Sequence, residues 1–234
     1  MSLVLFIDTT LGGFALGLAD KGNLSEGLAW SKIYSERFGA AQFLATSLRE
    51  GLNGLSAKPT DVSHIVVGKG PGSFTGIKIG LSFVTGLFTG KPEILLSGVS
   101  SLAILEDGLN DVSLKANKLT LATRATKAHG FCAVRSGDES FLDRNSYAFD
   151  LVDTHHSCFG SAALCTVGVW EEFDHAVMQN SGKKVRRLSM DESLRAVLKG
   201  MLENFSDLKF ESYPPQPQYL KKSTAEERLE QLEN

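Results

Sequence analysis

The feature that most constrains this chain is the glycine-rich block GKGPGSFTG at residues 68–76. It follows the strand-like run HIVV at 64–67 and precedes an apolar helical stripe, so it must turn a strand sharply into a helix. Glycine allows close approach of backbones, and the free N–H groups at a helix start attract anions. Because the G-x-x-x-x-G-K-[ST] spacing of a P-loop is absent, two interpretations stay open: an anion site, or a tight turn that lets neighbouring segments pack closely.

A second polar turn closes the first apolar run of the chain. Residues 3–7 are apolar, and Asp8, Thr9 and Thr10 follow directly. Ligands in α/β folds bind beyond the ends of strands, so this turn is a candidate for holding a metal-bound phosphate. The alternative is a local turn whose side chains satisfy backbone donors. The candidate residues for binding an anion or nucleotide are Asp8, Thr9, Thr10, Gly70, Gly72, Ser73, Thr75 and Gly76.

Hydrophobic periodicity predicts an α/β fold in the first hundred residues. A three-stranded antiparallel meander comes first, and helices and strands then alternate. The expected strands are 3–7, 14–18, 24–30, 64–67 and 94–96, and the expected helices are 35–55, 73–89 and one that begins at Leu102.

A similar mixture of elements resumes after residue 110. Four apolar runs precede a helical stripe, and the prolines at 214–217 require an extended tail. The apolar runs lie at 118–122, 131–134, 147–152 and 162–169, and the helical stripe lies at 194–202. We therefore expect two lobes, residues 1–108 and residues 109–234, the second ending in a charged tail.

Composition and charge exclude several classes of protein. The 42% hydrophobic and 22% charged residues are ordinary for a globular protein. The 24 basic and 27 acidic residues give a net charge of −3, so the molecule does not attract nucleic acid by its overall charge. Positive charge is concentrated at 183–187 and 221–222. Three cysteines without C-x-x-C spacing argue against a disulfide scaffold, and no apolar run approaches the ~20 residues of a membrane span. We expect a cytoplasmic protein.

The sequence offers only weak signals for a catalytic centre. None of the five histidines forms an H-x-x-x-H or H-E-x-x-H pair. Ser73 and the cysteines lack a nucleophile signature such as G-x-S-x-G. We therefore predict no metal site and no catalytic residue in this chain.

Four segments are similar to the bacterial TsaB (YeaZ) family: LFIDTT at 5–10, VVGKGPGSFTGIKIG at 66–80, GVSSL at 98–102 and PQYLKK at 217–222. The resemblance implies an α/β fold of two RNase H-like lobes of the ASKHA (actin-like ATPase) type, each a mixed sheet with helices. It also implies a part in forming threonylcarbamoyladenosine in tRNA, as a noncatalytic paralogue of TsaD without a metal. The implied partners are a TsaD-like catalytic subunit and a TsaE-like ATPase, with tRNA contacted only indirectly. No cofactor is firmly implied, and ATP or ADP at a partner interface stays open.

Two departures from the family pattern concern the second lobe and the first helix. The triplet Ala122-Thr123-Arg124 stands where the family commonly has Asp-Ala-Arg. The segment 34–38 replaces a basic, histidine-bearing helix start.

The expected partner surface lies on the two helices at 35–55 and 73–89. Their apolar stripes are expected to pack against a related fold or, in its absence, against a second copy of this chain. The predicted contact residues are Phe38, Ala41, Ala45, Leu48, Leu52, Ile77, Leu81, Phe83 and Val84. Glu in place of Leu48 or Phe83 is expected to abolish association. The competing interpretations are a small-molecule kinase of the same superfamily, with Asp8 and residues 70–76 around a nucleotide, and a metalloprotease.

Overall fold

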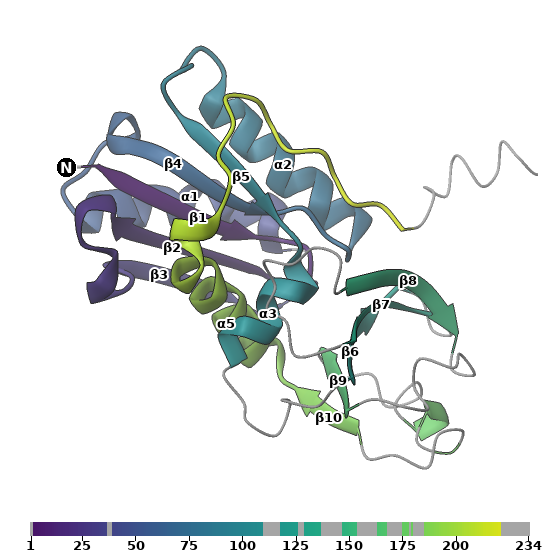
Figure 1. The fold of residues 1–234 in the computed structure, drawn as a ribbon. Helices are drawn as coiled ribbons and strands as arrows, with labels where there is room; N and C mark the ends of the chain where they lie inside the picture. The colour runs from purple at the N-terminus through teal and green to yellow at the C-terminus, as the bar shows by residue number, and fades with distance from the viewer. Residues whose placement is uncertain are drawn as a thin grey trace, which may run out of the picture.

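The described part of the computed structural model contains two five-stranded sheets and the helices α1, α2, α3 and α5 (Figure 1). The structure describes residues 2–36, 39–109, 118–125, 129–136, 147–153, 163–167, 175–177, 179 and 185–220. The predicted α/β class, with two mixed sheets, is confirmed.

The first sheet joins an antiparallel meander to two parallel strands. Strand β1 pairs antiparallel with β2 on one side and parallel with β4 on the other, which gives the order β3-β2-β1-β4-β5. The strands are β1 (Leu3–Asp8), β2 (Phe14–Asp20), β3 (Trp30–Tyr34), β4 (Val62–Gly68) and β5 (Leu95–Val99).

The second sheet repeats this arrangement. Its first strand pairs antiparallel with the next one along the chain and parallel with a later one, and the order is β10-β9-β6-β7-β8. The strands are β6 (Lys118–Arg124), β7 (His129–Ser136), β8 (Tyr147–Asp153), β9 (Ala163–Val167) and β10 (Val185–Leu188).

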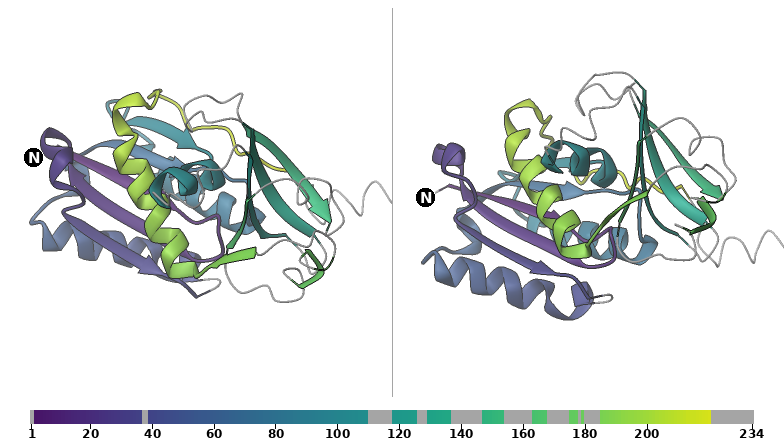
Figure 2. Two further views of the ribbon diagram at one scale, coloured as in Figure 1. Left: turned by 60° about the horizontal axis from the view of Figure 1, so that its bottom comes forward. Right: turned by 90° about the horizontal axis from the view of Figure 1, so that it is seen from below.

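Helices cover both faces of the first sheet, because alternate side chains of a buried strand point to opposite faces. Leu5 and Ile7 pack in the core beneath α1 (Gly39–Gly54) and α2 (Phe74–Phe88). Val4 and Phe6 pack in the opposite core with α3 (Ser101–Leu109) and α5 (Met190–Glu203). Figure 2 shows α1 and α5 on the two sides of the sheet.

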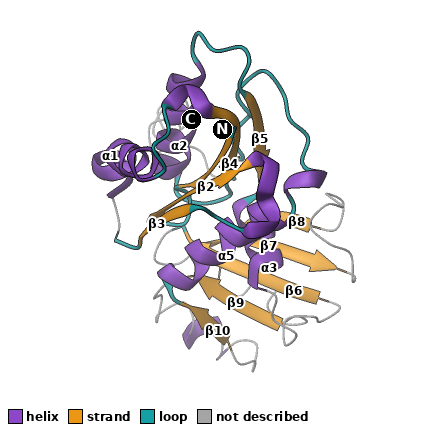
Figure 3. Ribbon diagram, turned by 90° about the vertical axis from the view of Figure 1, so that its left-hand side faces the viewer, coloured by secondary structure: helices purple, strands orange, loops and turns teal. Residues whose placement is uncertain are grey.

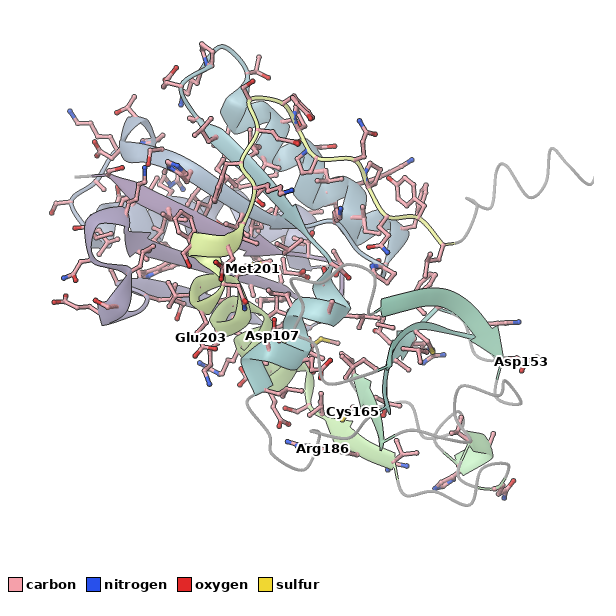
Figure 4. The ribbon with its side chains drawn as sticks, in the orientation of Figure 1. Asp107, Asp153, Cys165, Arg186, Met201 and Glu203 are labelled. Carbon is pink, nitrogen blue, oxygen red and sulfur yellow. The ribbon has the colours of Figure 1, made fainter. Side chains whose placement is uncertain are left out.

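Helices α3 and α5 lie between the two sheets (Figure 3). Their core also contains Leu121 and Cys165 of the second sheet, so one apolar cluster joins both lobes. The two helices cross closely, since a side chain at Gly108 would collide with the Ala196 carbonyl, and one at Gly200 with the Ile104 carbonyl. In Figure 4, Asp107 of α3 and Met201 of α5 mark this crossing.

The third strand of the meander differs from the sequence prediction. Residues 21–26 form a 3-10 helix, η1 (Lys21–Glu26), and the strand comes later, as β3. The Asp20 carboxylate accepts a hydrogen bond of 3.1 Å from the Gly22 amide, and Gly27 ends the turn with a φ of 90°, which suits glycine. Local turn chemistry therefore delays the third strand, which was predicted at 24–30 directly after the turn at 20–23.

The tail returns to the first sheet after α5. Beyond η5 (Phe205–Asp207), Glu211 and Leu96 exchange two backbone hydrogen bonds of 2.9 Å at the edge strand β5. The Gln218 amide donates to the Lys69 carbonyl over 2.8 Å, which ties the tail to the glycine block. The boundary at residue 108 stays a prediction, although α5 and the tail both pack on the first sheet. Among the described residues, no helix combines the length and apolar character needed to span a bilayer.

Candidate functional site

The glycine block packs tightly onto the turn between β1 and β2. Ser73 caps α2 by accepting a hydrogen bond of 3.2 Å from the Gly76 amide, and its own amide donates to the Thr10 carbonyl over 2.7 Å. The Thr9 hydroxyl donates to the Gly76 carbonyl over 2.7 Å. Side chains at Gly72 and Gly76 would collide with the carbonyls of Thr10 and Thr9. These two glycines are therefore needed for close packing.

Asp8 lies in the protein interior. Its Oδ1 accepts hydrogen bonds of 2.8 Å from the Thr10 amide and 3.0 Å from the Thr10 hydroxyl, and its Oδ2 accepts one of 2.5 Å from the Ser101 hydroxyl. The side chain is fully buried. Burial raises the pKa of Asp8, while the hydrogen bonds from Ser101 and Thr10 oppose that rise. The carboxylate thus connects the end of β1 to the start of α3.

A cavity of about 580 Å³ opens between the two sheets beside this turn. The first lobe contributes the β1–β2 turn and the start of α2, and the second lobe contributes the ends of β6 and β9 and the start of α5. The described lining residues are Thr9, Thr10, Leu11, Gly12, Gly13, Ser35, Ala40, Ser73, Thr75, Gly76, Ile79, Thr123, Arg124, Val167, Ser189 and Met190.

The predicted anion-binding residues divide into two groups in this structure. The cavity is lined by Thr9, Thr10, Ser73, Thr75 and Gly76, but not by Asp8, Gly70 or Gly72. Sequence reasoning did not assign Thr123, Arg124 or Ser189 to the site. One signal was available for Arg124, because it closes the first strand of the second lobe as Asp8 closes that of the first.

The predicted partner surface requires a correction. Leu48, Leu52, Ile77 and Val84 are buried inside the chain, with at most 5% of each side chain exposed, and are therefore unavailable to a partner. Glu in place of Leu48 would place a charge in this core and test folding rather than association.

The remaining predicted contact residues differ in exposure. Ala41 and Ala45 are exposed on α1, whereas Leu81 and Phe83 of α2 are half-buried against the first-lobe core. Phe38 lies outside the described residues. Helix α2 also exposes Thr85 and Gly86. We call Ala41, Ala45, Thr85 and Gly86 the small-residue face.

The second sheet holds two other groups that sequence analysis considered, Arg186 and Cys165 (Figure 4). Arg186 lies in β10, and its Nη2 donates to Glu192 Oε1 over 3.1 Å, so part of the basic run at 183–187 forms a strand with an ion pair. Residues 183–184 and 221–222 lie outside the described residues. Burial, with smaller contributions from Glu192 and Glu106, raises the pKa of the Cys165 thiol to about 12. This thiol therefore stays protonated near neutral pH.

Within the described ranges, no group of three or more His, Cys, Asp and Glu side chains has a geometry that could hold a metal ion. The cavity lining, as described, likewise contains no carboxylate, histidine, cysteine or lysine. Arg124 is its one charged residue.

Comparison with known sequences finds local similarity to two kinds of protein. The family model described as TsaD, tRNA N6-adenosine threonylcarbamoyltransferase, matches residues 41–110. The tRNA threonylcarbamoyladenosine biosynthesis protein TsaB of Escherichia coli (strain K12) is 43% identical over 49 residues, which cover 21% of each chain. The protein of the same name from Bacillus subtilis (strain 168) is 46% identical over 54 residues, 23% of each chain. These matches span about a quarter or less of the relatives' length.

Comparison with solved structures extends the similarity of fold to both lobes. A Pseudomonas aeruginosa protein, described as having similarity to peptidase YeaZ, superposes with a TM-score of 0.67 at 20% sequence identity. The match covers 94% of this chain and 100% of that one.

Proposed function

Because this chain belongs to the TsaB (YeaZ) family, we propose that it is a noncatalytic subunit of the machinery that forms threonylcarbamoyladenosine in tRNA. Its proposed partners are a TsaD-like catalytic subunit and a TsaE-like ATPase, and its contact with tRNA is indirect. When the TsaD-like partner is absent, a homodimer forms through the helices proposed to contact that partner, α1 and α2.

The observation that carries the noncatalytic role is the composition of the cavity between the lobes. General acid–base catalysis needs a titratable side chain within hydrogen-bond reach of the substrate. The described lining offers hydroxyls, backbone groups and one guanidinium, but no such acid or base. The nearby carboxylate, Asp8, is fully buried and bonded to Thr10 and Ser101. This arrangement favours a structural subunit over an enzyme.

The small-residue face is the proposed contact surface for the TsaD-like partner. The apolar side chains of α1 and α2 pack inward, and what these helices expose at Ala41, Ala45 and Gly86 is small. Nothing lies within 4 Å of a Cβ built at Gly86. Small exposed side chains let a partner helix approach closely, and helix faces commonly pack in this way. The match to the TsaD family model, residues 41–110, includes α2 and all of α1 except its first two residues.

The test is complex formation between the purified chain and a TsaD-like subunit. Light scattering detects the mass of the complex, and titration measures its affinity. Ala45→Arg places a long charged side chain on the small-residue face and is expected to weaken the complex at least 10-fold. Ser206→Arg is the matched control, since Ser206 is exposed on η5, which follows the helix on the opposite face of the first sheet. Absence of a complex with the unchanged chain, or equal affinity for both variants, would contradict the proposal.

The kinase alternative is tested on the isolated chain. It requires turnover of ATP with Mg²⁺ and a suitable acceptor, whereas the subunit proposal expects none without its partners. Turnover that survives repurification and is lost in a cavity variant would favour the enzyme.

A further inference from the structure

We propose that residues 208–220, which we call the strap, form a latch that opens as one unit while the rest of the protein stays folded. When it is closed, the strap covers the edge strand β5 and the outer side of the glycine block. When it opens, it uncovers both. This inference concerns a motion within the chain, so it goes beyond the proposed role as a subunit and does not depend on that role.

The strap wraps around the edge of the first sheet. Phe210 packs with the apolar core on the α3 and α5 side of the sheet. Pro215 lies on the other side, because a side chain at Gly98 would point to the same face as Leu96 and would collide with it. In Figure 1 the strap runs beside β5, turns back and then follows α2. It therefore passes from one face of the sheet to the other around β5.

Near its start, the strap is attached to the sheet by an aromatic ring and by its backbone. The Phe210 ring centroid lies 5.0 Å from that of His64 in β4 and 5.0 Å from that of Phe205. The next residue, Glu211, exchanges two backbone hydrogen bonds of 2.9 Å with Leu96. These bonds form an isolated bridge, so the strap pairs with the edge strand at one position only.

The far end of the strap is attached to the glycine block. The Gln218 amide donates a hydrogen bond of 2.8 Å to the Lys69 carbonyl. A Cβ built at Gly70 would be 2.9 Å from the Gln218 carbonyl oxygen, so the two backbones lie close together. The Tyr219 ring centroid lies 4.9 Å from that of Phe74, the first residue of α2. The strap thus forms an outer layer on the block, whose inner side packs on the β1–β2 turn.

The middle of the strap is stiff and weakly held. Among the described residues, no hydrogen bond between backbone groups joins residues 212–217 to another part of the chain. Three of these six residues are prolines, which have no N–H donor and favour a stiff, extended backbone. No residue of the strap is buried. Segments with few buried contacts open locally before the whole protein unfolds. Because the middle is stiff, we expect both attachments to be lost together.

The first test is amide hydrogen exchange of the full chain, followed residue by residue by NMR. The amides of Glu211 and Gln218 exchange when the strap opens, so we expect equal protection once their intrinsic rates are taken into account. Val66, buried in β4, reports unfolding of the whole chain and should be protected roughly 100-fold more strongly. Unequal protection of the two strap amides, or protection equal to that of Val66, would overturn the proposal.

Gly98→Ala should open the strap without changing its sequence. The Cβ of a proline is fixed to its backbone, so the strap must move away when the new methyl group collides with Pro215. We expect the protection of Glu211 and Gln218 to fall by the same factor, about 10-fold or more. Gly86→Ala is the matched control, because its methyl group meets open space, and it should leave both values unchanged. A loss confined to one of the two amides would show that the strap does not open as a unit.

A core substitution separates opening of the strap from unfolding of the chain. Ile7→Val removes one methylene group from the buried core and should lower the protection of Val66 about 5-fold. The protection of Glu211 and Gln218 should stay unchanged, because the core is intact whether the strap is closed or open. An equal loss at all three amides would mean that the strap opens only when the whole protein unfolds, which contradicts the latch. No partner is present in these experiments, so their outcome is independent of the complex-formation test.

Discussion

The first strands of the two sheets, β1 and β6, end at equivalent positions of the repeated topology, but with side chains of opposite charge. Asp8 of β1 pairs with Ala15 of the adjoining hairpin strand, and Arg124 of β6 pairs with Gly130 in the equivalent ladder. Asp8 is fully buried and bonded to the start of α3, whereas Arg124 lines the cavity. A repeated topology thus fixes where a strand end lies, while its neighbours decide whether its side chain is enclosed in the fold or lines a cavity.

The neighbours differ because α3 begins directly beside the end of β1. Ser101, the first residue of α3, donates to Asp8, and its amide donates to the Gly70 carbonyl over 3.0 Å. The glycine block then covers the turn from the other side. These contacts enclose Asp8. The cavity is therefore lined by Arg124 at the end of β6 and not by Asp8.

The largest effect is expected from disturbing the packing that encloses the first strand end. In Gly76→Ala the new methyl group would collide with the Thr9 carbonyl, so we expect a loss of about 3 kcal/mol in the free energy of unfolding, at the upper end of overpacking costs. In the same helix, Gly86→Ala meets open space and should stabilise the protein by about 1 kcal/mol. Urea unfolding measures both. Equal midpoints for the two variants would show that the glycine block is loosely packed.

A smaller effect is expected when the side chains at the two strand ends are removed, and the loss of stability should differ between Asp8 and Arg124. Asp8→Ala leaves the Thr10 amide and the Ser101 hydroxyl without their partner and should cost about 2 kcal/mol of stability. Arg124→Ala removes a half-buried side chain without described partners and should change stability by no more than about 0.5 kcal/mol. Similar losses in chemical denaturation would mean that both strand ends serve the fold.

The smallest effect is a pH dependence that belongs to Asp8 alone. Burial raises its pKa above the ordinary 3.8, so the folded protein binds this proton more tightly than the unfolded chain does. The stability of the unchanged protein relative to Asp8→Asn should therefore fall as pH rises from 3.8 through the folded-state pKa. The effect is limited because three hydrogen bonds to the carboxylate offset part of its desolvation. Parallel stability–pH curves for the two proteins would contradict it.

Local patterns predicted most of the fold but only half of the candidate site. The apolar runs at 118–122, 131–134 and 147–152 all lie in strands, because burial of a strand is visible in consecutive residues. Strand β10 was not predicted, because Arg186 and Arg187 break the apolar pattern of this short segment. Thr9 and the last part of the glycine block, Ser73, Thr75 and Gly76, do line the cavity as predicted, since their pattern is local.

The other half of the site depends on distant residues. Thr123 and Ser189 reach the cavity through the packing of α5 and the second sheet, which no local pattern contains. For Arg124 the one local signal was its place at the end of β6. Leu48 and Val84 were misassigned for a related reason. An apolar helical stripe predicts burial but does not say whether the covering surface belongs to the same chain or to a partner.

The return of α5 to the first sheet has a consequence for synthesis of the protein. The helix that covers Val4 and Phe6 is completed only at Glu203, after the whole second sheet has been made. While a ribosome produces the intervening residues, that side of the earliest strands lacks the cover of α5. The first part of the protein to be translated is therefore among the last to be fully enclosed.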